Sequence, residues 1–287
     1  MLNPSTVPTQ NNDHRNWGSL RSGSLPYVVD KLYKKQDTLC LVVTKDSQQA
    51  YSLEQALRFF ARSEDQKVSE DSIKVFSDWE TLPYDTFSPH EAIISQRLET
   101  LDSLASLKKG VLIVPASTLL QRLPPLEFLR SNSLVVKVGQ TFDVGHYRQQ
   151  LQIVGYRHVD TVYEHGEYAV RGAIFDIFPM GSDNPIRIEL FDDEVDSLRT
   201  FDPESQRSKE KMLGISILPA NEFPWDESSR LKFRNRWLEL FPNSDPRSPL
   251  LRDIKDGIKP HGIEYYNPMF FEAMASLFDY LPSNTLA

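Results

Sequence analysis

The sequence predicts a mixed α/β protein, in which a parallel-sheet α/β domain is followed by an α+β domain and a third unit. From about residue 18 to 122, helical stretches alternate with short continuous apolar runs, a pattern typical of strands buried in a parallel sheet. From about 155 to 207, apolar and polar residues alternate between turn signals, which favours an antiparallel sheet with one solvated face. A chain of 287 residues is long enough for two or three such units with a substantial core.

The elements of the first domain follow from apolar periodicity and from helix start and stop signals. In order, we expect a helix over 25–35, strand 38–43, helix 46–61, strand 73–76, helix 88–109 and strand 110–114. The clearest start is at Ser88, with Pro89 at N1 and Glu91 at N3, which together form a capping box. Lys109 suits the negative end of the helix dipole, and Gly110 is the expected stop.

The later elements are read in the same way. A short helix is expected over 144–154, and a longer one over 226–241 carries Phe233, Trp237 and Phe241 on one apolar face. A new apolar element starts within 281–287, so we expect the chain to be a piece of a longer protein. The predicted divisions are a flexible segment 1–17, an α/β domain 18–120, an inserted α+β domain 121–207 and a unit 208–287 that packs back on the first domain.

Composition excludes several classes of function. The net charge of −8 argues against bulk electrostatic capture of nucleic acid, which requires a basic surface. The single cysteine, Cys40, lies in an apolar run and is expected to be a buried core thiol in a reducing compartment. The first twenty residues lack the apolar region of a signal peptide, and no run reaches transmembrane length. We therefore expect a cytoplasmic protein without a membrane partner.

The pair of strands between Gly166 and Phe191 is the strongest candidate for a functional surface. In the second strand, period-two geometry places Ile186, Ile188 and Leu190 on the core face, and Arg187, Glu189 and Phe191 on the other. In the first strand the same count places Val170, Ile174 and Phe178 on one face, and Arg171, Ala173 and Phe175 on the other. The turn over 180–185 predicts an antiparallel hairpin that brings Arg171 near Arg187 or Glu189.

This surface has two interpretations. A phenylalanine beside an arginine on a polar strand face matches the composition of a protein-binding hot spot. The alternative is that Arg171 and Arg187 are solvated charges paired with Glu189 or Asp176, and that Phe191 caps a small core.

Three passages resemble a known family. They are 78–90 (DWETLPYDTFSPH), 155–179 with the run EHGEYAVRGAIFDIFP, and 186–201 (IRIELFDDEVDSLRTF). They are similar to the N-terminal region of the bacterial transcription-repair coupling factors (Mfd), which itself resembles the first three domains of the excision nuclease subunit UvrB. The resemblance covers the chain from about Gly18 and implies a UvrB-like domain 1a (18–120), domain 2 (121–207) and domain 1b (208–287).

The resemblance also implies a degenerate phosphate-binding loop in the α/β domain. A Walker A loop reads G-x-x-x-x-G-K-[ST], and its lysine and hydroxyl bind phosphate and magnesium. The corresponding frame starts at Gly18 and has Gly23, but Ser24 replaces the lysine and Leu25 replaces the hydroxyl residue. We therefore expect no catalytic residue, no cofactor and no ATP hydrolysis in this chain, whereas a full-length coupling factor would be an ATP-dependent DNA translocase.

The partner implied by the resemblance is UvrA, bound through domain 2. The residues that fall at matching positions are Arg171, Arg187 and Phe191, with Glu189, Arg157 and Glu167 as weaker neighbours. RNA polymerase and DNA would be bound only by domains absent here. The chain is thus expected to be a non-catalytic adaptor that recruits UvrA, and the alternative is a nucleotide- or DNA-binding, UvrB-like damage-handling module.

Other chemistry is not supported by residue spacing. His158 and His165 lie seven residues apart in an extended stretch, which is no metal-site spacing, and surface positions are expected for both. The acidic run 192–196 lacks the spacing and glycine of an EF-hand. No G-x-S-x-G motif of a serine hydrolase is present. We expect no metal site.

Overall fold

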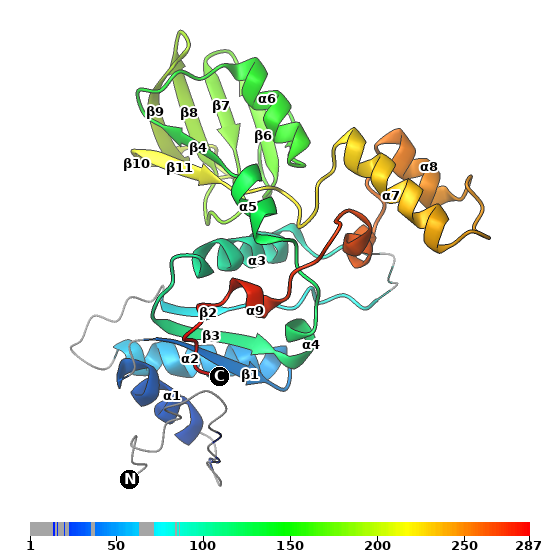
Figure 1. The fold of residues 1–287 in the computed structure, drawn as a ribbon. Helices are drawn as coiled ribbons and strands as arrows, with labels where there is room; N and C mark the ends of the chain where they lie inside the picture. Colours follow the sequence, from blue (N-terminus) through cyan, green and yellow to red (C-terminus); the bar gives the residue numbers. More distant parts are fainter. Residues whose placement is uncertain are drawn as a thin grey trace. The chain divides into compact units, whose positions relative to one another are not determined.

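The computed structural model describes residues 14, 16, 20, 23–35, 38–62, 72–83, 85 and 87–287. The chain is a mixed α/β protein that divides into two compact units (Figure 1). Unit 1 comprises residues 1–78, 103–120 and 280–287, and unit 2 comprises 79–102 and 121–279. The predicted flexible segment 1–17 lies largely outside the described residues, and the three-domain division stays a prediction.

Unit 1 is built on a three-stranded parallel sheet. Its elements are α1 (Ser24–Lys35), β1 (Leu39–Thr44), α2 (Ser47–Arg62), β2 (Ile73–Val75), β3 (Gly110–Pro115) and α4 (Ala116–Leu119). The strand order is β1-β3-β2, and both neighbours of β3 run parallel to it. The apolar element expected within 281–287 is seen as a bridge beside β1, where the Leu41 amide donates to the Leu286 carbonyl at 2.7 Å.

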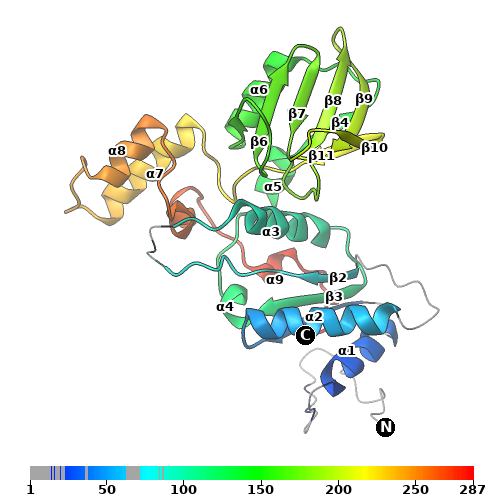
Figure 2. The same ribbon diagram turned by 180° about the vertical axis from the view of Figure 1, so that it is seen from behind.

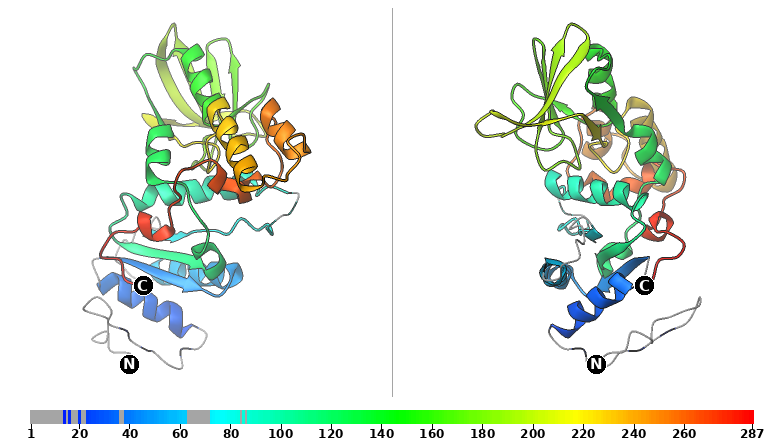
Figure 3. Two further views of the ribbon diagram at one scale, coloured as in Figure 1. Left: turned by 45° about the vertical axis from the view of Figure 1, so that its right-hand side comes forward. Right: turned by 90° about the vertical axis from the view of Figure 1, so that its left-hand side faces the viewer.

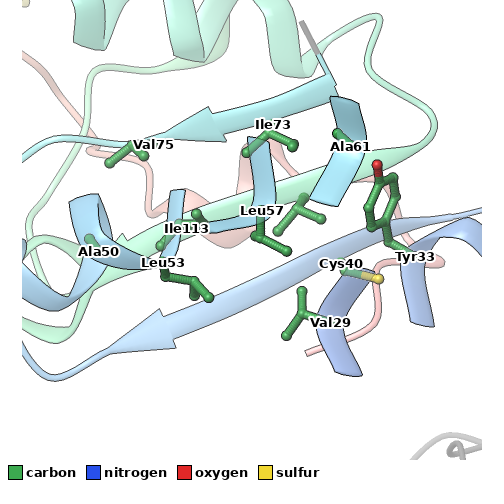
Figure 4. Packing of buried hydrophobic residues seen from close by; sticks show 11 residues of the cluster. Val29, Tyr33, Cys40, Ala50, Leu53, Leu57, Ala61, Ile73, Val75 and Ile113 are labelled. Carbon is green, nitrogen blue, oxygen red and sulfur yellow. The ribbon is translucent and has the colours of Figure 1, made fainter. Parts of the chain in front are cut away.

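The core of unit 1 lies between the helices α1 and α2 and the sheet. Figure 4 shows Val29 and Tyr33 of α1 and Leu57 of α2 packed with Cys40 of β1 and Ile113 of β3. Cys40 is 2% exposed, and burial raises the pKa of its thiol to about 11. The prediction of a buried core thiol is confirmed.

Helix α3 (Glu91–Leu104) differs at both ends from the prediction. Ser88 does not cap it: the hydroxyl donates to Glu264 Oε2 at 2.9 Å and accepts from the Gly262 amide at 3.1 Å. His90 Nδ1 instead accepts from the amide of Ala92 at 3.2 Å. The predicted capping box and the predicted end at Lys109 are therefore wrong, because a distant carboxylate binds the serine and the chain turns at residues 105–106.

Unit 2 contains a six-stranded sheet in the order β10-β9-β8-β7-β6-β5 (Figures 1 and 2). Its strands are β5 (Arg157–His158), β6 (Glu167–Arg171), β7 (Ile174–Ile177), β8 (Ile186–Phe191), β9 (Glu194–Phe201) and β10 (Ser208–Met212). All neighbours are antiparallel except β5 and β6. A separate antiparallel pair joins β4 (Leu134–Lys137) to β11 (Gly214–Ile217), which lies beyond the predicted boundary at 207.

The later helices of unit 2 include the two that were predicted, over 144–154 and 226–241, and several that were not. They are α5 (Leu126–Asn132), α6 (Val144–Ile153), α7 (Glu227–Leu240), α8 (Pro249–Asp256), the 3₁₀ helix η3 (Ile263–Met269) and α9 (Leu277–Tyr280). In α7 the Phe233 side chain is buried, and its ring stacks at 5.9 Å from that of Trp237, which lies 4.8 Å from that of Phe241. The predicted aromatic face is confirmed.

Segment 79–102 is joined to the rest of unit 2 by a buried ion pair. Arg97 and Glu222 are 0% and 1% exposed, and Arg97 Nε donates to Glu222 Oε1 at 2.5 Å. The Arg97 guanidinium also lies 5.1 Å from the Trp79 ring centroid. Two opposite charges satisfied in this way tolerate complete burial.

The two faces of the six-stranded sheet are covered differently. One face packs against Phe142 and Tyr147, the second of which belongs to α6, and Figure 3 shows this helix along the sheet. The opposite face carries a small cluster of Val162, Ala169, Phe178 and Phe201. That second face, only partly covered, carries the charged side chains described below.

No helix among the described residues is long and apolar enough to span a membrane.

Candidate protein-interaction surface

A two-residue turn between β6 and β7 decides which side chains share a face. Arg171 pairs with Ile174 and Val170 with Phe175, so each pair points to the same side of the sheet. The prediction that Val170 shares a face with Ile174, and Arg171 with Phe175, is wrong. A period-two count does not pass through residues 172 and 173, because Gly172 adopts φ +60° and the chain reverses there.

The prediction for β8 is confirmed at Ile186, Ile188 and Phe191, whereas Leu190, also placed on the core face, is only partly buried. Ile186 and Ile188 are 1% and 0% exposed, whereas Phe191 on the alternate face is 73% exposed. Phe191 therefore does not cap a small core, as one interpretation required. The cluster on that face of the sheet forms instead around Phe201.

A buried carboxylate lies at the centre of the charged face. Asp176 on β7 is directly opposite Arg187 on β8, and Arg171 lies diagonally across on β6. Arg187 Nε and Nη2 donate to the two Asp176 oxygens at 2.8 and 2.9 Å, and Arg171 Nη2 donates to Oδ2 at 2.6 Å. The hairpin thus brings Arg171 near Arg187, as predicted, and the pairing of both arginines with Asp176, which belonged to the alternative interpretation, is also observed.

The two arginines differ in exposure. The Arg171 side chain is 47% exposed and that of Arg187 is 12% exposed. Arg187 also donates through Nη1 to the Gln206 carbonyl at 3.2 Å, and its guanidinium lies 4.8 Å from the Phe201 ring centroid. Hydrogen bonding to Asp176 raises the pKa of Arg187 above its usual value, so the guanidinium is charged at all relevant pH values.

Glu189 lies on the same face, one pair of residues further along β8. It accepts a hydrogen bond from the Ser197 hydroxyl and lies 3.8 Å from Arg199 Nε, both on β9. Its carboxylate therefore has partners of its own and does not compete for Arg171.

Arg157 and Glu167 lie at the far end of β6 from Arg171. Glu167 is 8% exposed and accepts from the amides of Tyr163 and Glu164 at 2.9 Å each, which orders that loop. Arg157 lies 3.3 Å from Glu167 and is 56% exposed. The structure thus places the two weaker candidates apart from Asp176 and the two arginines that bind it.

Asp176 is the residue that the sequence reasoning left out of the candidate site. The available signal was an acidic residue inside the apolar run 174–178, because a buried charge requires a partner of opposite sign. Asp176 is 1% exposed, and both arginines supply that partner.

The remaining candidates are placed as follows. Of the predicted phosphate loop, Gly18 lies outside the described residues, Gly23 precedes α1, and Ser24 and Leu25 form its first turn. The loss of a Walker A site stays a prediction. In the described part of the chain, no group of three or more His, Cys, Asp or Glu residues could hold a metal ion.

The two histidines have different surroundings. His158 is exposed, as expected. The His165 ring is half-buried and packs 4.0 Å from that of Phe178, with Nε2 at 2.9 Å from the Ser182 carbonyl oxygen. Burial lowers its pKa below the usual value.

Comparison with known proteins identifies the family. The profile of the UvrB interaction domain matches residues 134–223, which include the whole charged face. The chain is 44% identical to the transcription-repair-coupling factor of Haemophilus influenzae and 43% identical to that of Escherichia coli, over 98% of its length in both cases. It is 32% identical to the Bacillus subtilis factor over 77% of its length.

These matches span 24% of the Haemophilus and Escherichia proteins and 21% of the Bacillus protein. The chain therefore covers about a quarter of the length of the curated relatives that it matches. Over that span, it belongs to the transcription-repair-coupling factor family, and its residues 134–223 match the UvrB interaction domain.

Proposed function

We propose that this chain is a non-catalytic adaptor region that recruits UvrA in transcription-coupled nucleotide excision repair. The observation that carries the proposal is Phe191, 73% exposed at the end of β8 on the face that holds the ordered arginines Arg171 and Arg187. An exposed aromatic beside rigid arginines is the composition of a protein-binding hot spot. The surface lies within the region that matches the UvrB interaction domain.

Charge supports a protein partner over a nucleic acid. Residues 121–207 contain 9 basic and 14 acidic side chains, a net charge of 9 − 14 = −5. The exposed Phe191 is followed directly by Asp192, Asp193 and Glu194. A phosphate backbone would be repelled there, because affinity for nucleic acid comes mainly from neutralising phosphates with Lys and Arg.

The wider role follows from the longer relatives. In the full-length protein, we propose an ATP-dependent DNA translocase that displaces stalled RNA polymerase through domains outside this chain. This region would then recruit UvrA to the stalled RNA polymerase. It would contribute a docking surface and no chemistry of its own.

The test is the affinity of the chain for purified UvrA, measured by biolayer interferometry. Phe191→Ala is expected to weaken binding by at least about thirtyfold, on the order of the 2 kcal/mol that defines a hot spot. The melting temperature should not change, because the side chain is exposed. Leu120→Ala is the matched control: this side chain is 83% exposed but belongs to unit 1, and binding should be unchanged.

Equal binding by wild type and Phe191→Ala would overturn the assigned surface. A second measurement addresses the nucleotide-binding alternative. A ligand that binds the folded state must raise the melting temperature. We expect no shift with ATP and magnesium, and a clear shift at micromolar ATP would contradict the adaptor proposal.

A further inference from the structure

We infer that Asp176 is a positioning residue that gives the two arginines different roles. Arg171 contacts a carboxylate of the partner, whereas Arg187 stabilises the surface through contacts within the chain. This inference rests on the proposed function and specifies how the surface recognises UvrA. It assigns a role to a residue that the UvrB-like resemblance did not mark, and it separates two arginines that the resemblance treats alike.

The strand arrangement places Asp176 where it can act on both sides. It lies on β7, between β6 with Arg171 and β8 with Arg187, and all three side chains point to the same face. Oδ2 accepts from both guanidinium groups, at 2.6 Å from Arg171 and 2.9 Å from Arg187. A carboxylate that is 1% exposed and held in this way is rigid, so each guanidinium that it binds is fixed as well.

The donors of Arg187 are directed inward. Nε and Nη2 donate to Asp176, Nη1 donates to the carbonyl of Gln206, and the guanidinium lies over the ring of Phe201. Little of the guanidinium is left for a partner, since the side chain is 12% exposed. Gln206 lies in the loop between β9 and β10 and adopts φ +59°. The hydrogen bond from Arg187 to its carbonyl therefore also stabilises this loop.

Arg171 is directed outward. Its hydrogen bond to Asp176 uses Nη2 alone, and nearly half of the side chain is exposed. Two guanidinium charges against one carboxylate leave a net charge of +1 at this point of the surface. A guanidinium with exposed N–H groups in a fixed plane can form a bidentate pair of hydrogen bonds with a carboxylate. The expected partner group is therefore an Asp or Glu side chain.

The other acidic candidates on this sheet are engaged by partners of their own. Glu189 is engaged by Ser197 and by Arg199 on β9. Arg157 and Glu167 form their own pair at the other end of β6. The ordered, exposed guanidinium of Arg171 is therefore available to the partner together with the ring of Phe191.

The experiment is a double-mutant cycle on UvrA affinity. Asp176→Asn keeps the shape of the side chain but removes its charge, and Arg171→Ala removes the proposed contact. Each single variant is expected to weaken UvrA binding about tenfold, and the double variant should bind no more weakly than either single one. The reason is that Asp176→Asn removes the ordering of the Arg171 guanidinium, and Arg171→Ala removes that guanidinium itself. A merely structural role for Asp176 would give effects that multiply to about a hundredfold.

If Asp176→Asn fails to fold, a second pair of variants still tests the different roles of the two arginines. Replacing arginine by lysine keeps the positive charge but removes the planar guanidinium. Arg171→Lys is expected to weaken UvrA binding at least about fivefold, whereas Arg187→Lys should change it less than about threefold, because a lysine on β8 still pairs with Asp176. The reverse order would overturn the division of roles.

The outcomes separate this inference from the proposed function. If Phe191→Ala loses UvrA but Asp176→Asn binds as wild type, the inference is wrong and the adaptor function stands. If Phe191→Ala binds as wild type, the adaptor surface itself is wrong. Multiplicative effects of Asp176→Asn and Arg171→Ala also overturn the positioning role.

Discussion

The parallel sheet of unit 1 and the antiparallel sheet of unit 2 use their strands in different ways. All six residues of β3 are buried, whereas in β8 only Ile186 and Ile188 are buried, the other residues are partly exposed and Phe191 is exposed. A parallel strand between two neighbours is covered on both faces, so its side chains are committed to the core. An antiparallel strand can turn alternate positions away from the core, and the candidate surface of this chain occupies such positions on β6, β7 and β8.

The largest predicted effects come from adjacent substitutions in the two sheets. In β3, Leu112→Ala and Ile113→Ala should each lower the free energy of unfolding by about 2–5 kcal/mol, because both side chains are fully buried. In β8, Ile188→Ala should cost as much, whereas Glu189→Ala should cost less than about 1.5 kcal/mol, since it loses mainly a hydrogen bond. Urea unfolding followed by circular dichroism measures all four, and equal costs for the two β8 variants would break the comparison.

Two glycines at the ends of strands give a smaller contrast. A Cβ at Gly110 would lie 2.2 Å from the backbone carbonyl oxygen of Ser72, so Gly110→Ala must displace β2 or β3. A Cβ at Gly172 would meet no atom within 4 Å, and only its φ of +60° opposes a side chain. We expect Gly172→Ala to cost about 1 kcal/mol and Gly110→Ala clearly more.

Thermal melting of the two glycine variants provides the measurement. Gly172→Asn is the internal control, because asparagine tolerates the left-handed region better than alanine and should recover part of the loss. A Gly110→Ala variant as stable as wild type would show that the sheet of unit 1 is less closely packed than the distances indicate.

Local periodicity was sufficient to predict most elements of residues 25–114, two later helices and one face of the candidate site. The order of helices and strands up to β3, helix α7, and the exposure of Phe191 all depend on residues within a few positions of one another. The prediction failed where a partner is distant in sequence. Ser88 looks like a helix cap, but its hydroxyl binds Glu264, 176 residues away. The pairing of β4 with β11 is of the same kind.

The candidate site was predicted only in part. The reason is that the alternation of side chains along a strand does not continue through a turn. Counting in twos from Val170 to Phe178 ignores the reversal at residues 172–173, which sets the register of the hairpin. With the register known, Asp176 falls between Arg171 and Arg187, and its burial requires both. The sequence therefore indicated the arginines and the phenylalanine, but not the carboxylate that orders them.

The smallest predicted effect is a pH dependence confined to unit 2. Burial against Phe178 lowers the pKa of His165, so the native state keeps this ring neutral where the unfolded chain, with a pKa of about 6.5, binds a proton. The stability that this provides is complete above about pH 6.5 and is lost as the pH falls from there through the folded-state pKa. The Ser182 carbonyl, Asp183 and Glu91 oppose the shift, and His90 adds to it, so the net loss is modest.

Hydrogen exchange at about pH 7 and about pH 5.5, on either side of the unfolded-state pKa, isolates this effect when wild type and His165→Phe are compared after correction for intrinsic exchange rates. In wild type, protection of the amides of β6 and β7 should fall at the lower pH, and the phenylalanine variant, which keeps the ring contact but cannot bind a proton, should show a smaller fall. The core cluster of unit 1 contains no histidine among its described residues, so amides of β1 and β3 should be protected alike in both proteins. An equal loss of protection in the two sheets would mean that acid acts on the whole chain, and that the second face of the antiparallel sheet has no pH response of its own.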